Sequence, residues 1–191
     1  MRFYKPPFAK LFFPEVITKL KNDLYITIDD SPSENTGRIL DLLDEKGIKA
    51  TFFCVGQNVL KYPHLQDEIV KRGHSVGIHS FFHKSAFKVS KDFYLYDAKL
   101  AGDVINSSLF RPPYGHLTFP IYNELKKNFK IVLWSYMTYD FRRVRIIRDD
   151  KISQGSIIVL HDKPDFYDVF ENHLSQIIAI SAKKNLSFNK L

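Results

Sequence analysis

Short apolar runs alternate with longer amphipathic segments along almost the whole of this 191-residue chain. The apolar runs have the length and β-branched content of buried strands, and the longer segments space their apolar residues as helices do. Strands are predicted over residues 24–29, 50–55, 74–78, 109–110, 130–135, 156–161 and 186–188. Helices are predicted over 36–47, 58–72 with an interruption near Pro63, about 90–107, 118–128 and 167–184. This alternation predicts an α/β fold, with a parallel sheet and helices outside it.

Length and composition fit one globular domain, because 45% hydrophobic and 26% charged residues exclude a disordered chain. No stretch approaches the roughly 18 consecutive apolar residues of a membrane span, and no secretory signal is visible, so we expect a cytoplasmic protein. The single cysteine, Cys54, lies in an apolar run and excludes an internal disulfide or a cysteine-based zinc cluster. We expect residues 1–20 to be an N-terminal extension and residues 21–191 to be the domain.

The net charge of +7 raises the question of nucleic-acid binding. One basic cluster lies in residues 1–21 and a second in residues 142–151, but neither is interleaved with a nucleic-acid-binding signature. A solvated basic face is the simpler interpretation, so we expect no nucleic-acid partner. The sequence does not indicate an oligomeric state.

Residues that can carry chemistry gather where the predicted strands end. They are Asp29, Asp30, His79, Arg111 and His161, with Asp140 a few residues after the fifth strand. In parallel α/β folds the active site lies at the carboxyl ends of the strands. The agreement of five strand ends therefore predicts an enzyme.

A metal site is indicated by two histidines and a pair of acids. His79 and His83 are four residues apart, which brings both rings to one face of a helical turn, although the spacing alone is a weak signal. Asp29 and Asp30 would repel each other unless a cation relieved them, or they could serve as a helix N-cap. Taken together, Asp30, His79 and His83 suit Zn²⁺ or a similar first-row ion and leave Asp29 free as a general base.

Two further groups fit a hydrolytic site. His161 ends an apolar run and could be a satisfied core residue, or it could be a proton donor that Asp140 orients. Residues 111–115, with sequence RPPYG, are rigid by composition. Such a turn could hold the Arg111 guanidinium against Asp29, or place a backbone N–H at an oxyanion.

From residue 20 to residue 190 the chain resembles the polysaccharide deacetylases of carbohydrate esterase family 4, which are built on the NodB homology domain. Five motifs of that family occur in order: TIDDSP at 27–32 for T-F-D-D-G-P, HSFFH at 79–83 for H-[S/T]-x-x-H, RPPYG at 111–115 for R-x-P-Y-G, DF at 140–141 for D-W, and VLH at 159–161 for L-x-H. Four positions depart from the pattern, namely Ile28, Ser31, Phe141 and Val159. The last two put the acetyl pocket and the sugar platform in doubt, whereas the metal and proton-transfer positions are kept.

The resemblance implies a distorted (β/α)7 barrel, similar to a TIM barrel, in a single domain. It also implies roles for individual residues: Asp29 as base, Arg111 as its tether, His161 as acid with Asp140 beside it, the Tyr114 N–H at the oxyanion, Pro113, Tyr114, Phe141 and Val159 at the substrate, and Asp30, His79 and His83 as metal ligands. One divalent ion is expected, Zn²⁺ first, with Co²⁺, Ni²⁺ or Mn²⁺ as alternatives.

The expected activity is hydrolysis of a linear amide, which removes N-acetyl groups as acetate from an amino-sugar glycan such as peptidoglycan or a chitin-like polymer. O-acetyl esters are a possible second target. One alternative is a metal-dependent amidohydrolase for a small non-sugar amide or cyclic ureide. A non-catalytic glycan-binding module is less favoured, because such a module has no use for both Asp29 and His161.

Overall fold

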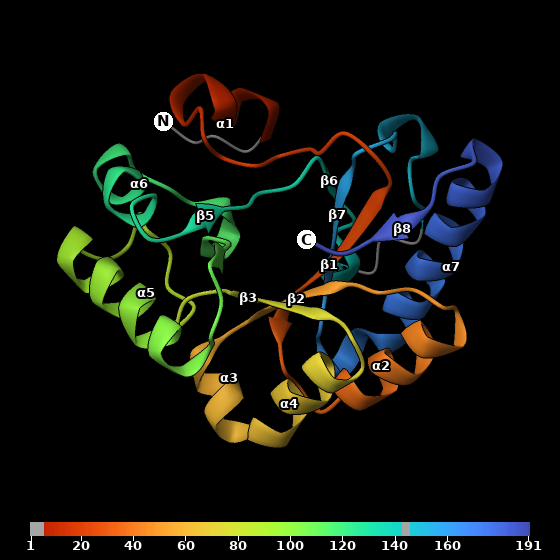
Figure 1. The fold of residues 1–191 in the computed structure, drawn as a ribbon, viewed down its shortest axis with the longest axis horizontal. Helices are drawn as coiled ribbons and strands as arrows, with labels where there is room; N and C mark the ends of the chain where they lie inside the picture. The colour runs from red at the N-terminus through yellow and green to blue at the C-terminus, as the bar shows by residue number, and fades with distance from the viewer. Residues whose placement is uncertain (1–5, 143–145) are drawn as a thin grey trace.

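One curled sheet of eight short strands forms the centre of the molecule, and most of the helices lie outside it (Figure 1). The computed structural model describes residues 6–142 and 146–191. In chain order the elements are α1 (Pro6–Phe12), β1 (Leu24–Ser31), α2 (Thr36–Glu45), β2 (Thr51–Cys54), α3 (Gly56–Lys61), α4 (Pro63–Lys71), β3 (Ser75–Ile78), α5 (Lys91–Val104), β4 (Leu109–Phe110), η1 (Pro113–Gly115), α6 (Phe119–Leu125), β5 (Lys130–Ile131), β6 (Tyr136–Met137), η2 (Asp140–Arg142), η3 (Asp149–Lys151), β7 (Ile157–His161), η4 (Pro164–Phe166), α7 (Tyr167–Lys184) and β8 (Phe188–Asn189).

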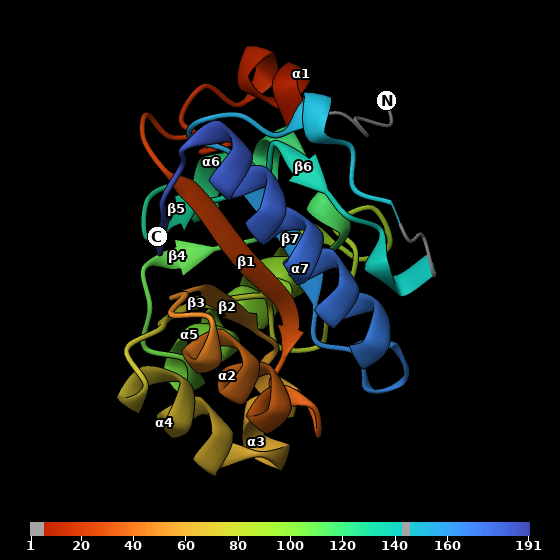
Figure 2. The same ribbon diagram turned by 90° about the vertical axis from the view of Figure 1, so that its right-hand side faces the viewer.

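The strands follow the order β5-β4-β3-β2-β1-β7-β6, and each neighbouring pair is parallel. In the described part of the chain β5 and β6 each end this path and do not pair with each other, so the barrel is open between them. Helices connect most of the parallel strands, and α7 lies across the outer face of β1 and β7 (Figure 2). The predicted α/β fold, a distorted (β/α)7 barrel in a single domain, is confirmed.

The central strand β1 is buried on both of its faces. Leu24, Ile26 and Ile28 belong to the main apolar core that the helices cover. The alternate side chains point to the opposite face, as the pleat of a strand requires. There Tyr25 packs with apolar residues of other strands, and Thr27 accepts a hydrogen bond from a buried arginine. The next residue on this face is Asp29, which therefore lies at the carboxyl edge of the sheet.

The strand predicted over 130–135 is wrong in its extent: β5 ends at Ile131, and the next strand, β6, begins only at Tyr136. The chain pairs with β4 only as far as Ile131, and Ser135 already bonds to Ile157 of β7. Residues 132–135 thus cross from one end of the sheet to the other. The strand predicted over 186–188 is β8, which pairs with Leu24 and Tyr25 of β1 outside the seven-strand path.

Residues 15–20 run beside the opening between the two ends of the sheet. Ile17 donates its N–H to the carbonyl oxygen of Ile131 and accepts from Leu133, and Leu20 donates to Gly155. We call these backbone contacts the seam. The residues before it are also packed, since Ala9, Phe13 and Val16 belong to the main core.

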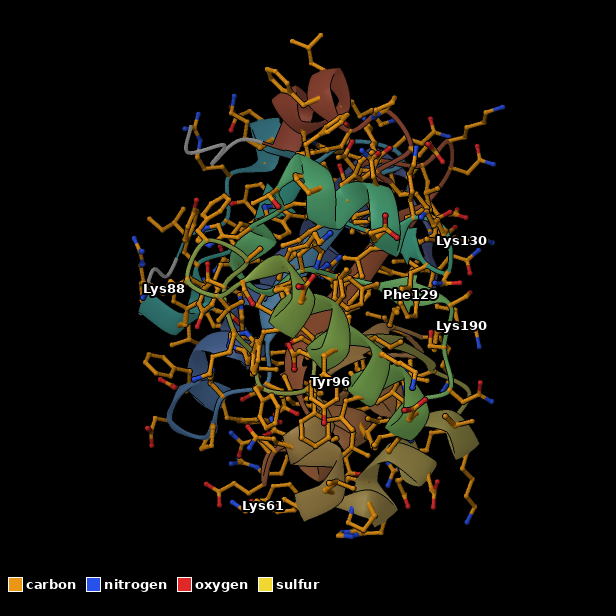
Figure 3. The ribbon with its side chains drawn as sticks, turned by 90° about the vertical axis from the view of Figure 1, so that its left-hand side faces the viewer. Lys61, Lys88, Tyr96, Phe129, Lys130 and Lys190 are labelled. Atoms are coloured by element: carbon orange, nitrogen blue, oxygen red, sulfur yellow. The ribbon has the colours of Figure 1, made fainter. Side chains whose placement is uncertain are left out.

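No helix among the described residues is long and apolar enough to cross a bilayer. Basic side chains are spread over the surface, and Figure 3 shows Lys61, Lys88 and Lys130 at three separate parts of one side. The cytoplasmic location stays a prediction.

Candidate active site

Asp29 and Asp30 are adjacent in β1, yet both carboxylates reach the same site. In a regular strand neighbouring side chains point to opposite faces. Here the register against β2 slips between Asp29 and Ser31, and Asp30 takes a left-handed φ of 68°. Such a β-bulge places one extra residue opposite its partner strand and re-aims a side chain. Asn58 fixes the bulge, because its Nδ2 donates to the Asp30 carbonyl oxygen at 2.8 Å.

The two histidines flank a tight turn at the end of β3. Ser80 and His83 both have left-handed φ angles, 63° and 53°. A buried carboxylate of α5, Asp97, holds this turn: its Oδ1 accepts from the N–H groups of Phe81 at 2.9 Å and Phe82 at 2.8 Å. Strain in the turn is thus countered by two hydrogen bonds from outside it.

Three side chains could hold a divalent metal ion, namely Asp30, His79 and His83, whose donor atoms all lie within 4.8 Å of one another. Oδ1 of Asp30 is 3.0 Å from Nε2 of His83 and 3.8 Å from Nε2 of His79. Nδ1–H of His79 donates to the Arg111 carbonyl oxygen at 2.7 Å, which leaves the Nε2 lone pair for a metal.

The protonation of these groups also suits a cation. Burial lowers the pKa of His79 to about 4, so its ring is neutral near pH 7. Burial alone would raise the pKa of Asp30, but the hydrogen bond from His83 and the nearby imidazoles hold it well below its usual range. A carboxylate and two imidazole nitrogens are a donor set that fits Zn²⁺ and similar ions.

Arg111 is fully buried and ties Asp29 to the barrel wall. Its Nη1 donates to Oδ1 of Asp29 at 2.7 Å and to Oγ1 of Thr27 at 2.7 Å, and its Nη2 donates to the Leu133 carbonyl oxygen at 2.9 Å. The guanidinium also lies 4.0 Å from the centre of the Phe53 ring. Because one oxygen of Asp29 is held in this way, the other oxygen is left for the site.

His161 ends β7 directly opposite Asp29 in the register of β1 and β7. Its Nδ1–H donates to Oδ1 of Asp140 at 2.7 Å, and its backbone N–H donates to Oδ2 of the same carboxylate. Burial opposes protonation of the ring, yet the hydrogen bond and charge of Asp140 raise the pKa of His161 above its usual value. Phe141 packs edge-on against this ring, with 4.7 Å between the ring centroids.

The rigid turn at 111–115 presents Tyr114 with a left-handed φ of 61°. Gly115 and His116 donate their N–H groups to carbonyl oxygens of the same turn. The N–H of Tyr114 makes no hydrogen bond within the part of the chain that the structure covers. The Tyr114 ring lies beside the His83 ring at 4.8 Å and is largely exposed.

These groups open into one pocket of about 500 Å³. Its lining includes every predicted ligand, together with Asp29, His161, Tyr114 and Phe141. Exposed rings of Phe87 and Tyr139 add to the walls. Two residues predicted at the substrate lie elsewhere: Pro113 and Val159 are buried and do not line the pocket.

Sequence reasoning missed several residues that shape the site. Trp134 lines the pocket because residues 132–135 cross the sheet opening. Asp162 locks the loop after Asp30 through hydrogen bonds from the hydroxyls of Ser33 and Thr36, both at 2.5 Å. The sequence pattern could have identified Asp97, because this charged residue lies on the same helix face as Tyr94, Ala98 and Ala101, which are buried.

Comparisons with known proteins agree with this geometry. A family model described as polysaccharide deacetylase matches residues 17–129. A peptidoglycan-N-acetylglucosamine deacetylase of Bacillus cereus is 34% identical over 160 residues, which are 75% of this chain and 57% of that protein. A chitooligosaccharide deacetylase of Azorhizobium caulinodans is 31% identical over 160 residues, 76% of each chain. This chain therefore spans little more than half the length of the Bacillus relative.

Among solved structures, the Bc1960 peptidoglycan N-acetylglucosamine deacetylase superposes with a TM-score of 0.83 at 26% identity. The match covers 98% of this chain and 95% of that one. The resemblance inferred from the five motifs is confirmed.

Proposed function

Because this chain belongs to the polysaccharide deacetylase family, we propose that it is a metal-dependent hydrolase that removes N-acetyl groups from an amino-sugar glycan and releases acetate. One observation carries the proposal. The three possible metal ligands, Asp29 with its partner Arg111, and His161 with its partner Asp140 all meet at the same pocket. Amide hydrolysis needs both a base to activate water and an acid to protonate the departing nitrogen. The glycan is the proposed partner.

A divalent ion held by Asp30, His79 and His83 would polarise the acyl oxygen and lower the pKa of a nearby water. We favour Zn²⁺, because two imidazole nitrogens and one carboxylate oxygen are its common ligands, with Co²⁺, Ni²⁺ and Mn²⁺ as the alternatives to load.

Asp29 is the proposed base. Arg111 holds its Oδ1, and its Oδ2 lies 3.9 Å from Nε2 of His79, on the side of the metal ligands. From this position Oδ2 takes a proton from the attacking water. The fixed guanidinium keeps the carboxylate from rotating during that transfer.

His161 is the proposed acid. Asp140 holds Nδ1, so Nε2 is the ring nitrogen that can reach substrate. The raised pKa keeps the ring protonated over a wider pH range. Its proton passes to the amide nitrogen, the C–N bond breaks, and the sugar leaves as a neutral amine.

The turn and the aromatic walls orient the substrate. The Tyr114 N–H is the proposed donor to the oxyanion, because its hydrogen bond is not taken up within the turn. The flat faces of Tyr114 and Phe141 suit the apolar faces of a pyranose ring. Pro113 and Val159 support these groups without facing the substrate: Pro113 is buried directly before Tyr114, and Val159 is buried in β7 two residues before His161.

Acetate release tests the proposal. Metal-loaded protein is incubated with N-acetylglucosamine oligomers, peptidoglycan and acetylxylan, with and without a chelator. Release from a glycan that the chelator stops is the expected result. Hydrolysis of a small cyclic amide, with no acetate from any glycan, would favour the amidohydrolase alternative and sink the proposal.

A further inference from the structure

Lys163 follows β7 and its backbone is held in place. The preceding residue, Asp162, is locked by Ser33 and Thr36. Nδ2 of Asn35 donates to the carbonyl oxygen of Lys163 at 2.9 Å and to that of Pro164 at 2.8 Å. The backbone position from which the Lys163 side chain extends is thus fixed.

The ammonium group of Lys163 lies beside the proposed metal ligands. Its Nζ is 2.7 Å from Oδ2 of Asp30, whereas Oδ1 of Asp30 faces His79 and His83. The two oxygens of this carboxylate therefore serve different partners, and a cation on the Oδ1 side would leave the lysine contact in place. An ammonium has three donors, so two remain beyond the bond to Asp30. The side chain is 41% exposed, which makes those donors accessible.

Lys163 also stands between two pockets. It lines the pocket of about 500 Å³ described above and a second one of about 370 Å³ on the other side of Asp30 and His83. Cationic groups lie further along both: Arg142 lines the first pocket and Lys61, at the end of α3 (Figure 3), lines the second.

Acidic residues also line the second pocket, namely Glu34 and Asp162 in addition to Asp30. Asp162 is buried, its oxygens accept hydrogen bonds, and burial raises its pKa. Glu34 is thus the exposed acidic residue of this pocket, which Lys61 and Lys163 also line with positive charges.

We propose that Lys163 binds a carboxylate carried by the glycan, so that the preferred substrate is an acidic N-acetylated glycan rather than a neutral one. This inference rests on the proposed function. The two remaining ammonium donors can form a charge-assisted hydrogen bond with a second carboxylate, which the lysine attracts as a point charge. The bound group would lie on the sugar that is deacetylated or on its neighbour, because Lys163 borders both pockets beside the ligand Asp30.

The test uses two probes that differ only in charge. One is the N-acetylglucosaminyl–N-acetylmuramic acid disaccharide of peptidoglycan, whose lactyl group carries a carboxylate, and the other is its primary amide. Acetate release gives kcat/KM for each, and calorimetry gives each binding constant. The proteins are metal-loaded wild type, Lys163→Gln, Lys163→Arg and, as a matched control, Lys99→Gln. Lys99 is an exposed lysine of α5 that lines neither pocket.

The wild type should prefer the acid over the amide by roughly tenfold, the effect of one charge-assisted hydrogen bond at a partly exposed site. Lys163→Gln should bring the acid-to-amide ratio close to one, Lys163→Arg should restore most of it, and Lys99→Gln should leave it as in the wild type. The ratio is taken within one variant, so a change in metal content cancels.

Failure of this inference differs from failure of the proposed function. Equal hydrolysis and equal binding of the two probes by the wild type would overturn the inference and leave the deacetylase intact. Tighter, Lys163-dependent binding of the acid without any acetate release would support the inference and overturn the function. A preference that survives in Lys163→Gln would assign the anion site to other residues and overturn the inference.

Discussion

Asp29 and Asp30 are neighbours that hold different partners. Arg111 occupies one oxygen of Asp29, whereas Asp30 faces two histidines and a lysine. The bulge between them brings to one site two carboxylates that a regular strand would point to opposite faces, and each keeps its own partners. We therefore expect substitutions of the two carboxylates to have different effects on metal content and turnover.

Asp30→Asn should lose most of the bound metal, since a neutral amide is a poor ligand. Asp29→Asn should keep the metal and lose roughly 10²–10⁴-fold in turnover, the usual worth of a general base. Metal content by atomic emission and kcat from acetate release measure both. Equal metal loss in the two variants would contradict this division.

The His161–Asp140 pair predicts a pH dependence. His161 must be protonated to act as an acid, and its raised pKa extends activity toward higher pH. Asp140→Asn removes the charge and the strong acceptor, so the pKa of His161 should fall. The alkaline limb of the kcat/KM profile should then move to lower pH.

The matched control for this shift is Asp150→Asn, which removes an exposed carboxylate paired with Arg148. Its profile should keep the wild-type limb. If Asp140→Asn also kept that limb, the acid would be a group other than His161.

At the scale of elements, α5 and the turn after β3 work together. Asp97 reaches from the helix to two N–H groups of a turn that holds two left-handed residues. Without those bonds the turn can relax and separate the two histidine rings, whose centroids are 5.0 Å apart. Through this turn the helix would influence the proposed metal site without supplying a ligand to it.

Asp97→Ala should weaken metal binding by roughly tenfold, as the loss of such supporting groups commonly does. Asp97→Asn keeps an oxygen acceptor and should retain most of the affinity. A chelator competition titration measures the effect, and Asp103→Ala, at an exposed acid of the same helix, is the control. Equal affinities for Asp97→Ala and Asp103→Ala would show that the turn needs no outside support.

Local patterns predicted most of the elements, and they picked out Asp29, Asp30, His79, His83 and His161, which line one pocket. Strand ends and helical spacing depend on neighbouring residues, so one sequence is enough to find them. These patterns failed where the structure of a segment depends on residues far away in the sequence. The apolar run at 131–134 is typical of one buried strand, but pairing with β4 ends at Ile131 and Ser135 already bonds to β7, which places Trp134 at the pocket. The contact of Lys163 with Asp30 likewise has no local signature.

For the stability of the whole molecule we consider the seam, because it lies where the barrel is open. Gly155 accepts the N–H of Leu20 and has a φ of 80°. A Cβ at this position would lie 1.9 Å from the carbonyl oxygen of Leu20. Glycine is therefore required both by the left-handed backbone and by the close approach of the N-terminal segment.

Gly155→Ala should lower the free energy of unfolding by about 1–3 kcal/mol, from the strained φ and the clash together. Gly37→Ala, in α2, is the matched control, because nothing lies within 4 Å of its added Cβ. It should be neutral or stabilise by up to about 1 kcal/mol. Thermal and urea unfolding compare the two, and equal stabilities would show that the seam contributes nothing.

From the seam we expect an order of events in folding. Residues 17–20 come early in the chain, but their partners at 131–133 and 155 belong to its other half. Asp29 likewise meets His161 only through pairing of β1 with β7. Contacts between such remote residues form late and slowly. During synthesis Asp29 and Asp30 are therefore made long before His161, the proposed acid, and we expect the proposed site to be complete only once the last third of the chain is made.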